Sequence, residues 1–242
     1  MSDARLAVAF LTRIPAGDVG PVDGPRLSRA AAWFPLIGLL VGAVAGGVHW
    51  ACGQLGLPPG PATLVALLSA ILLTGGFHED GIADVCDAWG AHVGRERKLE
   101  ILSDSRVGTY GALAVAFALL FAYSALAGLS DEAFLRASIT GHVVGRWTVL
   151  PVSRLLGPAK PDGKGSLVRA GWPALIGGTL LASVIVAFAA HGTTPAAVGL
   201  ALVVGAAATT VLGRTFGGIT GDGFGTVNKL AELACYAAFA AA

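Results

Sequence analysis

Acidic side chains gather in one short stretch of this sequence, GGFHEDGIADVCDAWG, at residues 75–90. If the stretch is helical, each residue advances by about 100°, so Asp80, Asp84 and Asp87 share one face. Clustered carboxylates repel one another unless a cation lies between them, and hard oxygen ligands suit Mg²⁺ or Mn²⁺. The stretch therefore predicts a metal site that would hold the phosphates of a substrate. Its candidate ligands are Glu79, Asp80, Asp84 and Asp87, with His78 beside them.

Two other interpretations of the acidic stretch stay open. The first is a solvated acidic helix face, although surface helices usually mix their charges and no Lys or Arg occurs between residues 76 and 94. The second is a zinc site, for which the chain offers no His or Cys partners at useful spacing.

Basic and polar residues follow in RERKLEILSDSRVGTYG, residues 95–111. Lys98 and Arg106 are candidates for binding phosphate groups, because cationic side chains form strong, charge-assisted hydrogen bonds to them. Asp104 lies in a polar turn that leads into an apolar segment, where a helix N-terminus would favour an anion. The alternative is that the basic residues only mark a cytoplasmic loop.

A third polar region, GGITGDGFGTVNKLAELACY, covers residues 217–236. Its glycines predict a loop or a broken helix lining a polar cavity, with Asp222 inside it. Asn228 and Glu232 are four residues apart and share a helix face, and Lys229 is a further candidate for clamping phosphate groups. An acid in a membrane helix is a candidate functional residue, and the alternative is a glycine-rich linker.

Arg146 and His142 are also four residues apart, within an otherwise apolar segment. A buried arginine in a membrane helix needs an anionic partner, which a carboxylate or a substrate phosphate would provide. We therefore count Arg146 among the candidate phosphate-binding residues, together with Lys98, Asp104, Arg106, Asn228, Lys229 and Glu232.

The composition is that of a membrane protein. Of the 242 residues, 55% are hydrophobic and only 13% are charged, where a soluble domain has about 25% charged residues. The mean hydropathy is +0.73. A formal net charge of +1 gives no sign of nucleic-acid binding. Abundant glycine and alanine would let helices, or copies of the chain in a homo-oligomer, approach closely.

Hydropathy predicts a single all-α, membrane-embedded catalytic domain over residues 1–242, in contact with lipid, with about seven transmembrane helices. The expected spans are 31–55, 61–77, 109–129, 133–152, 171–190, 195–213 and 229–242. With the N-terminus in the cytoplasm, 14 of the 16 Lys and Arg residues fall in the cytoplasmic segments 1–30, 78–108, 153–170 and 214–229. The polar regions fall on the same side, which predicts a catalytic site at the cytoplasmic face of the membrane.

Four motifs together resemble the cobalamin synthase, or adenosylcobinamide-GDP ribazoletransferase, family. They are FLTRIP (10–15), the acidic stretch at 75–90, LEILSDSRVGTYGALA (99–114) and TGDGFGTVNKLAEL (220–233), in family order over nearly the whole chain. The chain departs from the family pattern at Ala88 and Thr226, and neither difference removes a candidate ligand.

The resemblance implies an enzyme of the bacterial inner membrane that depends on Mg²⁺. Its substrates would be adenosylcobinamide-GDP and α-ribazole or α-ribazole 5′-phosphate, with adenosylcobalamin or its phosphate as product and GMP leaving. In that reaction the metal would neutralise the pyrophosphate. The expected catalytic residues are His78, Asp80, Asp84 and Asp222, and either Glu79 or Asp222 would complete the metal coordination or act as general base.

Two other classes of protein fit parts of the pattern. A CDP-alcohol phosphotransferase shares the D-G-x-x-A opening, but that family has Arg where this chain has Asp84, and two further acids that are missing between residues 105 and 130. A cation transporter would distribute its acids toward the middle of the membrane, whereas here they crowd one edge.

Overall fold

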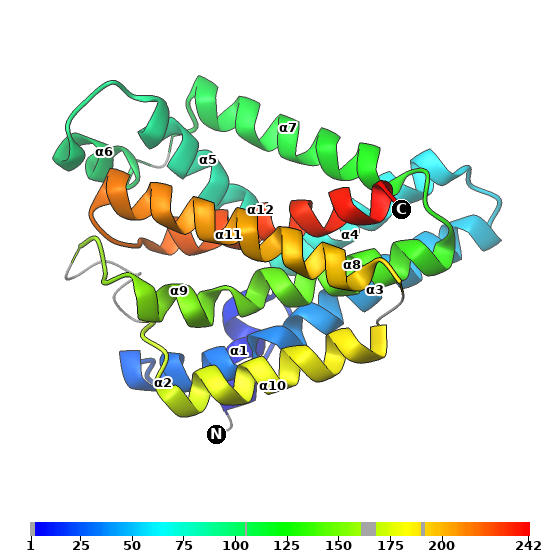
Figure 1. Cartoon of the computed structure of the whole chain (residues 1–242), viewed down its shortest axis with the longest axis horizontal. Helices are drawn as coiled ribbons and strands as arrows, with labels where there is room; N and C mark the ends of the chain where they lie inside the picture. Colours follow the sequence, from blue (N-terminus) through cyan, green and yellow to red (C-terminus); the bar gives the residue numbers. More distant parts are fainter. Residues whose placement is uncertain (1–2, 105, 161–167, 190–191) are drawn as a thin grey trace.

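A computed structural model describes residues 3–104, 106–160, 168–189 and 192–242, and these form a helical bundle (Figure 1). The expected all-α class is confirmed, since no strand occurs among the described residues. Twelve α-helices are present there: α1 (Asp3–Leu11), α2 (Gly24–Ala30), α3 (Phe34–Gln54), α4 (Pro59–Thr74), α5 (Phe77–Gly90), α6 (Arg95–Ile101), α7 (Thr109–Leu126), α8 (Asp131–Trp147), α9 (Val149–Leu155), α10 (Trp172–Ala189), α11 (Thr194–Phe216) and α12 (Gly221–Ala240).

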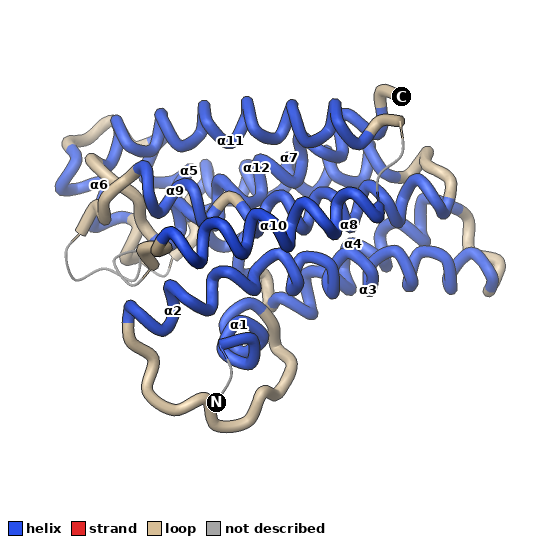
Figure 2. The backbone as a smooth tube through the Cα atoms, turned by 60° about the horizontal axis from the view of Figure 1, so that its bottom comes forward, coloured by secondary structure: helices blue, strands red, loops and turns tan. Residues whose placement is uncertain are grey.

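The long helices lie side by side along the long axis of the molecule, and the short helix α1 crosses them, seen nearly end-on in Figure 2. Among the described residues, four helical segments are long and apolar enough to cross a membrane. They are the continuous segment Gly24–Gln54 and the helices α7, α10 and α11. These helices expose many large apolar side chains, such as Phe117, Leu180 and Val203, which indicates a membrane protein.

A count of seven spans is not confirmed. Helices occupy all seven expected ranges, but α8 and α12 do not reach the length and apolarity of a lipid-facing span. The reason is their position, because α12 packs against α5, α7, α8 and α11, and α8 packs against α3, α10 and α12. Helices enclosed by other helices can carry polar side chains, so hydropathy describes them poorly.

The second expected span, 61–77, corresponds to α4 and ends at a sharp bend into α5. Helices α4 and α5 meet at an angle of 87°, and together they would make a fifth span or a re-entrant segment. Gly75 and Gly76 form the bend with φ values of 71° and 70°, a left-handed conformation that glycine adopts readily. The bend directs α5, which carries the acidic residues, toward α12.

The expected glycine-rich loop before α12 is shorter than the sequence predicts. Gly217 ends α11 in a left-handed conformation, but Gly221, Gly223 and Gly225 lie in the first turns of α12. The Thr220 hydroxyl accepts a hydrogen bond from the Gly223 N–H at 3.0 Å and caps the helix. The helix therefore begins eight residues before the expected span at 229–242.

The connections α5–α6 and α11–α12 lie together at one end of the bundle, with the described parts of the connections α6–α7 and α9–α10 (Figure 1). Several basic residues belong to this end, and some of them hold it together. Arg95 donates from Nε to the Phe216 carbonyl at 2.7 Å, at the C-terminus of α11, and Lys160 donates to the Leu99 carbonyl at 2.7 Å. We call this the basic end.

Candidate active site

The site forms where α5 crosses α12. A Cβ atom placed on Gly81 of α5 would lie 2.9 Å from the Asp222 carbonyl oxygen and 3.4 Å from the Gly225 Cα atom. The Thr226 hydroxyl donates to the Gly81 carbonyl at 3.1 Å. Gly81 therefore allows the two backbones to touch, and it brings Asp222 to the acidic face of α5.

The carboxylates of Asp80, Asp84 and Asp222 are grouped at this crossing. Asp84, which is partly buried, experiences the negative charges of Asp80, Asp222 and Asp87. Asp80 is exposed and lines two cavities, one of which Asp222 lines too. Asp80 and Asp222 thus face open space with the charge of Asp84 nearby, which favours the binding of a cation.

Asp87 points to a different partner. Its two carboxylate oxygens accept hydrogen bonds from the N–H groups of Gly108 at 2.7 Å and Gly111 at 2.8 Å. These donors are at the N-terminus of α7, where a negative charge is stabilised by the helix dipole. A Cβ atom on either glycine would collide with the Asp87 carboxylate. Asp87 therefore holds α7 to α5, and both glycines leave space for it.

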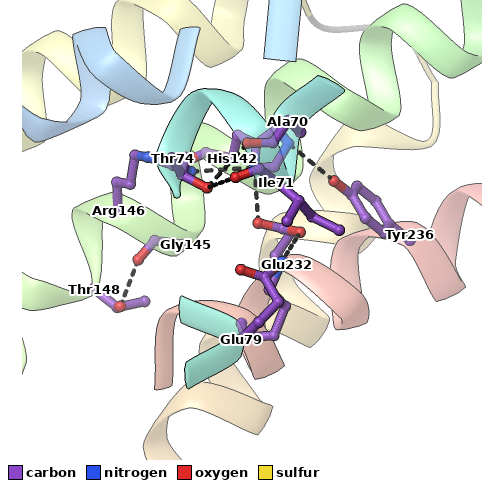
Figure 3. Close-up of polar contacts among 11 residues, drawn as sticks. Ala70, Ile71, Thr74, Glu79, His142, Gly145, Arg146, Thr148, Glu232 and Tyr236 are labelled. Carbon is purple, nitrogen blue, oxygen red and sulfur yellow. Dashed lines mark hydrogen bonds and ion pairs between the residues drawn. The ribbon is translucent and has the colours of Figure 1, made fainter. Parts of the chain in front are cut away.

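Glu79 belongs to a buried ionic cluster with Lys229 and Glu232 of α12 and with His142 of α8. Figure 3 shows Glu79, Glu232 and His142 of this cluster. The Lys229 ammonium lies 2.7 Å from Glu79 Oε1 and 2.8 Å from Glu232 Oε1. The other Glu232 oxygen lies 2.7 Å from Nδ1 of His142. The cluster corrects the expectation that Lys229 belongs to a cytoplasmic loop, since only 8% of this residue is exposed.

Glu79 and Asp87 therefore have other partners, and the predicted set of four metal ligands is not assembled. Among the described residues, no group of three His, Cys, Asp or Glu side chains is arranged to hold a metal ion. The carboxylates grouped at the crossing of α5 and α12 are those of Asp80, Asp84 and Asp222. Mg²⁺ is commonly bound through one or two carboxylates together with substrate phosphates, so these residues fit a metal that arrives with its substrate.

Arg146 and Asn228 are buried deeper than the acids, each with 1% exposure. Arg146 donates from Nη1 to the His142 carbonyl at 3.2 Å, but its Nε has no partner among the described residues. Neither the nitrogen nor the oxygen of the Asn228 amide has a partner there. Buried polar groups are nearly always hydrogen-bonded, so these two side chains have capacity to bind a ligand.

His78 lines the same cavity as Asp80 and Asp222. It is buried, with 4% exposure, and it interacts electrostatically with Arg146 and Lys229. Its ring packs edge-on against Phe77 at 5.3 Å between ring centroids. The predicted catalytic and deep phosphate-binding residues therefore come from α5, α8 and α12, three helices that contact one another in the pairs α5–α12 and α8–α12.

The remaining candidates lie at the basic end. Lys98 donates to the Trp89 carbonyl at 3.4 Å, near the C-terminus of α5. Arg106 is 87% exposed, and its Nη2 donates to the Asp104 carboxylate at 2.7 Å. This hydrogen-bonded pair lowers the pKa of Asp104 to about 2. These three residues do not contact the buried candidates, and their role in binding phosphate stays a prediction.

Two cavities open beside Asp80. The inner cavity, of about 420 Å³, reaches between α3, α8 and α12 and includes Phe34, Arg146, Asp222 and Asn228 among its lining residues. The outer cavity, of about 750 Å³, lies between α1, the α4–α5 bend and the start of α7, and includes Arg13, Glu79 and Val107. Asp80, Phe10 and Phe77 line both.

Sequence reasoning missed these aromatic walls and the place of Arg13. Phe10 stacks on Phe34 with ring centroids 5.9 Å apart and meets Phe77 edge-on at 5.6 Å. Arg13 packs over Gly75 at the α4–α5 bend. The FLTRIP segment contains Phe10 and Arg13, so this motif was the signal in the sequence for both residues. The segment contains no acid, and only the fold shows that it lies beside Asp80.

Comparisons with known proteins show which family the chain resembles. The family model described as cobalamin-5-phosphate synthase matches residues 3–240. Curated relatives named adenosylcobinamide-GDP ribazoletransferase include proteins of Azorhizobium caulinodans, 36% identical over 97% of this chain and 93% of the relative, and Bradyrhizobium diazoefficiens, 35% identical over 96% and 91%. One from Ralstonia nicotianae is 36% identical over 94% and 90%.

No solved structure matches the chain. The match to the family model covers nearly every residue, and the similarity to the relatives is continuous over almost the full length of both proteins. The chain therefore belongs to the cobalamin-5-phosphate synthase family.

Proposed function

We propose that this protein is an adenosylcobinamide-GDP ribazoletransferase. It joins the cobinamide phosphate of adenosylcobinamide-GDP to α-ribazole or α-ribazole 5′-phosphate and releases GMP. The names of its relatives support this reaction. The structural observation that carries it is the grouping of Asp80, Asp84 and Asp222 beside cavities that also contain cationic side chains.

The chemistry is one displacement at phosphorus. A ribose hydroxyl oxygen of the acceptor forms a bond to the phosphorus that carries cobinamide, and the bond from that phosphorus to the bridging oxygen of GDP breaks. GMP leaves with the electron pair, and the hydroxyl proton passes to a carboxylate acting as general base. Asp80 and Asp222 are the candidates for this base because they line a cavity that can hold the acceptor.

Mg²⁺ is the cofactor we assign to the reaction, and it would be held by one or two of Asp80, Asp84 and Asp222 together with the pyrophosphate. When bound, it would neutralise negative charge on the leaving GMP. The ionic cluster has a separate role, since Glu79, Lys229 and Glu232 fix α5 against α12 and so hold the acidic residues in place.

We place the protein in the bacterial inner membrane, in contact with lipid, with the site open to the cytoplasm. The support is the distribution of charge, because basic residues concentrate in the connections at one end of the bundle. The helix α12 begins at that end, and Asp222 is its second residue. Glu232 lies ten residues further along, or about 15 Å deeper at 1.5 Å per residue.

An assay of detergent-purified protein tests the function. The protein is incubated with adenosylcobinamide-GDP, α-ribazole and Mg²⁺, and both GMP and the cobamide product are measured. We expect equal amounts of the two, and loss of both when Mg²⁺ is removed with a chelator. Absence of a cobamide product from protein that remains folded would refute the proposed function.

A further inference from the structure

The two cavities beside Asp80 differ in character. The inner cavity is the more enclosed one, and its walls combine the aromatic rings of Phe10, Phe34 and Phe77 with the buried amide of Asn228. The outer cavity is larger and is bounded by Arg13 and by Val107 at the start of α7. The edge-on contact between Phe10 and Phe77 forms part of the partition, because both rings line both cavities.

The proposed reaction joins two molecules of very different size and chemistry, and this inference rests on that reaction. We infer that the inner cavity binds the ribazole acceptor and that the outer cavity holds the pyrophosphate of the donor, with Asp80 at the boundary between them. The specificity-determining residue for the acceptor is Asn228, and Arg13 is the corresponding residue for the donor.

The inner cavity matches the acceptor in chemistry. A benzimidazole base is flat and apolar and offers a single ring nitrogen as a hydrogen-bond acceptor. Aromatic walls suit such a ring system, and a single buried amide can donate to the nitrogen and accept from a ribose hydroxyl. Both polar atoms of Asn228 lack partners among the described residues. A volume of about 420 Å³ is in the range of pockets for small organic molecules.

The donor does not fit the same enclosed space. Its corrin ring system is much larger than a nucleoside, so it must remain in an open region while its pyrophosphate reaches the carboxylates. The outer cavity provides this arrangement, because it is larger and more open and is lined by both Arg13 and Asp80. Arginine pairs well with phosphate oxygens.

This arrangement also sets the direction of the displacement. The acceptor hydroxyl would approach the phosphorus from the inner cavity. GMP would leave the phosphorus on the opposite side, into the outer cavity. Phosphoryl transfer requires the attacking and leaving oxygens to be roughly in line. The partition between the cavities would therefore place both substrates in a geometry that favours attack.

Two substitutions test the assignment. Asn228→Ala is expected to raise the KM for α-ribazole about tenfold, with little effect on the KM for adenosylcobinamide-GDP. Arg13→Gln is expected to raise the KM for adenosylcobinamide-GDP, with little effect on the KM for α-ribazole. Arg13→Lys should restore part of the donor affinity. Binding of labelled α-ribazole to the purified protein without donor, measured by equilibrium dialysis, should weaken in Asn228→Ala and stay unchanged in Arg13→Gln.

The thermal midpoint separates binding from folding. Asn228→Ala should not lower it in the absence of substrate, because no hydrogen bond of the Asn228 side chain is present among the described residues. If Asn228→Ala raises the KM for the donor instead, the guanosine of the donor occupies the inner cavity and the inference is wrong. If Asn228→Ala binds α-ribazole in dialysis as tightly as a wild type that makes product, the inference is also wrong. A wild type that makes no product refutes the proposed function itself.

Discussion

The ammonium group of Lys229 lies 2.7 Å from the carboxylate of Glu79, and this contact joins α12 to α5 inside the bundle. Lys229 also pairs with Glu232, so one positive charge balances part of the charge of two acids. All three side chains are largely buried, with side-chain exposures of 11%, 13% and 3% for Lys229, Glu79 and Glu232. The pair is therefore an internal connection that supports the site.

Lys229→Met should strongly destabilise the protein. Removing one partner leaves buried carboxylates without compensation, at a cost of about 3–5 kcal/mol. The double substitution Lys229→Met with Glu79→Gln removes one charge of each sign, and it should recover part of that loss. Thermal midpoints in detergent measure both. As a control, Arg97→Gln removes an exposed pair with Glu100 and should change the midpoint little. Equal midpoints for all variants would contradict the structural role of the cluster.

Gly81→Ala should reduce activity by at least about tenfold while the protein still accumulates in the membrane. The new Cβ atom would lie 2.9 Å from the Asp222 carbonyl oxygen, so α5 and α12 must separate at the point where their acids meet. Such small displacements of catalytic groups are costly to the rate. Gly47→Ala is the matched control, because a Cβ atom there meets nothing within 4 Å. Full activity of Gly81→Ala would show that the close crossing does not position the acids.

Asp84→Asn and Asp87→Asn should have different effects, although the sequence places both acids on one helix face. Asp84→Asn should raise the Mg²⁺ concentration for half-maximal activity, because it removes charge beside Asp80 and Asp222. Asp87→Asn should leave that concentration nearly unchanged and lower the thermal midpoint, since Asp87 accepts two N–H bonds from α7. A larger shift in the Mg²⁺ requirement for Asp87→Asn than for Asp84→Asn would reverse these assignments.

The exposed pair of Asp104 and Arg106 should make little difference to the pH profile near neutrality. Arg106 lowers the pKa of Asp104 to about 2, so Asp104 is ionised throughout the range in which the enzyme is assayed. Because its pKa is depressed, ionised Asp104 contributes stability at pH values above the ordinary Asp pKa of about 4. This contribution is lost as the pH falls toward 2. The measurement is the pH–rate profile of Asp104→Asn between about pH 6 and 9, whose shape should match the wild type.

Sequence reasoning identified the helices of the site because their polar residues repeat at helical spacing. The pairs His142–Arg146 and Asn228–Glu232 do face the same interior region, since His142 contacts both Arg146 and Glu232. Spacing along one helix cannot show what the neighbouring helix presents, however. Asp84 and Asp87 share a face on α5, yet only the position of α7 determines that Asp87 binds two backbone N–H groups.

Gly81 illustrates the same limit. Its place after Asp80 in the sequence does not show that α12 packs directly against it. Hydropathy likewise located the apolar helices α7, α10 and α11 well. It described α8 and α12 poorly, because these helices are enclosed by others and satisfy their charges with one another.

The buried ionic cluster also affects how the chain enters the membrane during synthesis. Its members on α5 and α8 precede α12 in the chain, so Glu79 and His142 enter the bilayer before Lys229 and Glu232 are made. An unpaired charge at that depth costs at least about 2.5 kcal/mol. Insertion of α12 brings the Lys229 ammonium to the Glu79 carboxylate, and the cost of that earlier charge then falls. The contacts of Lys229 and Glu232 would therefore favour packing of α12 against both α5 and α8 as it inserts.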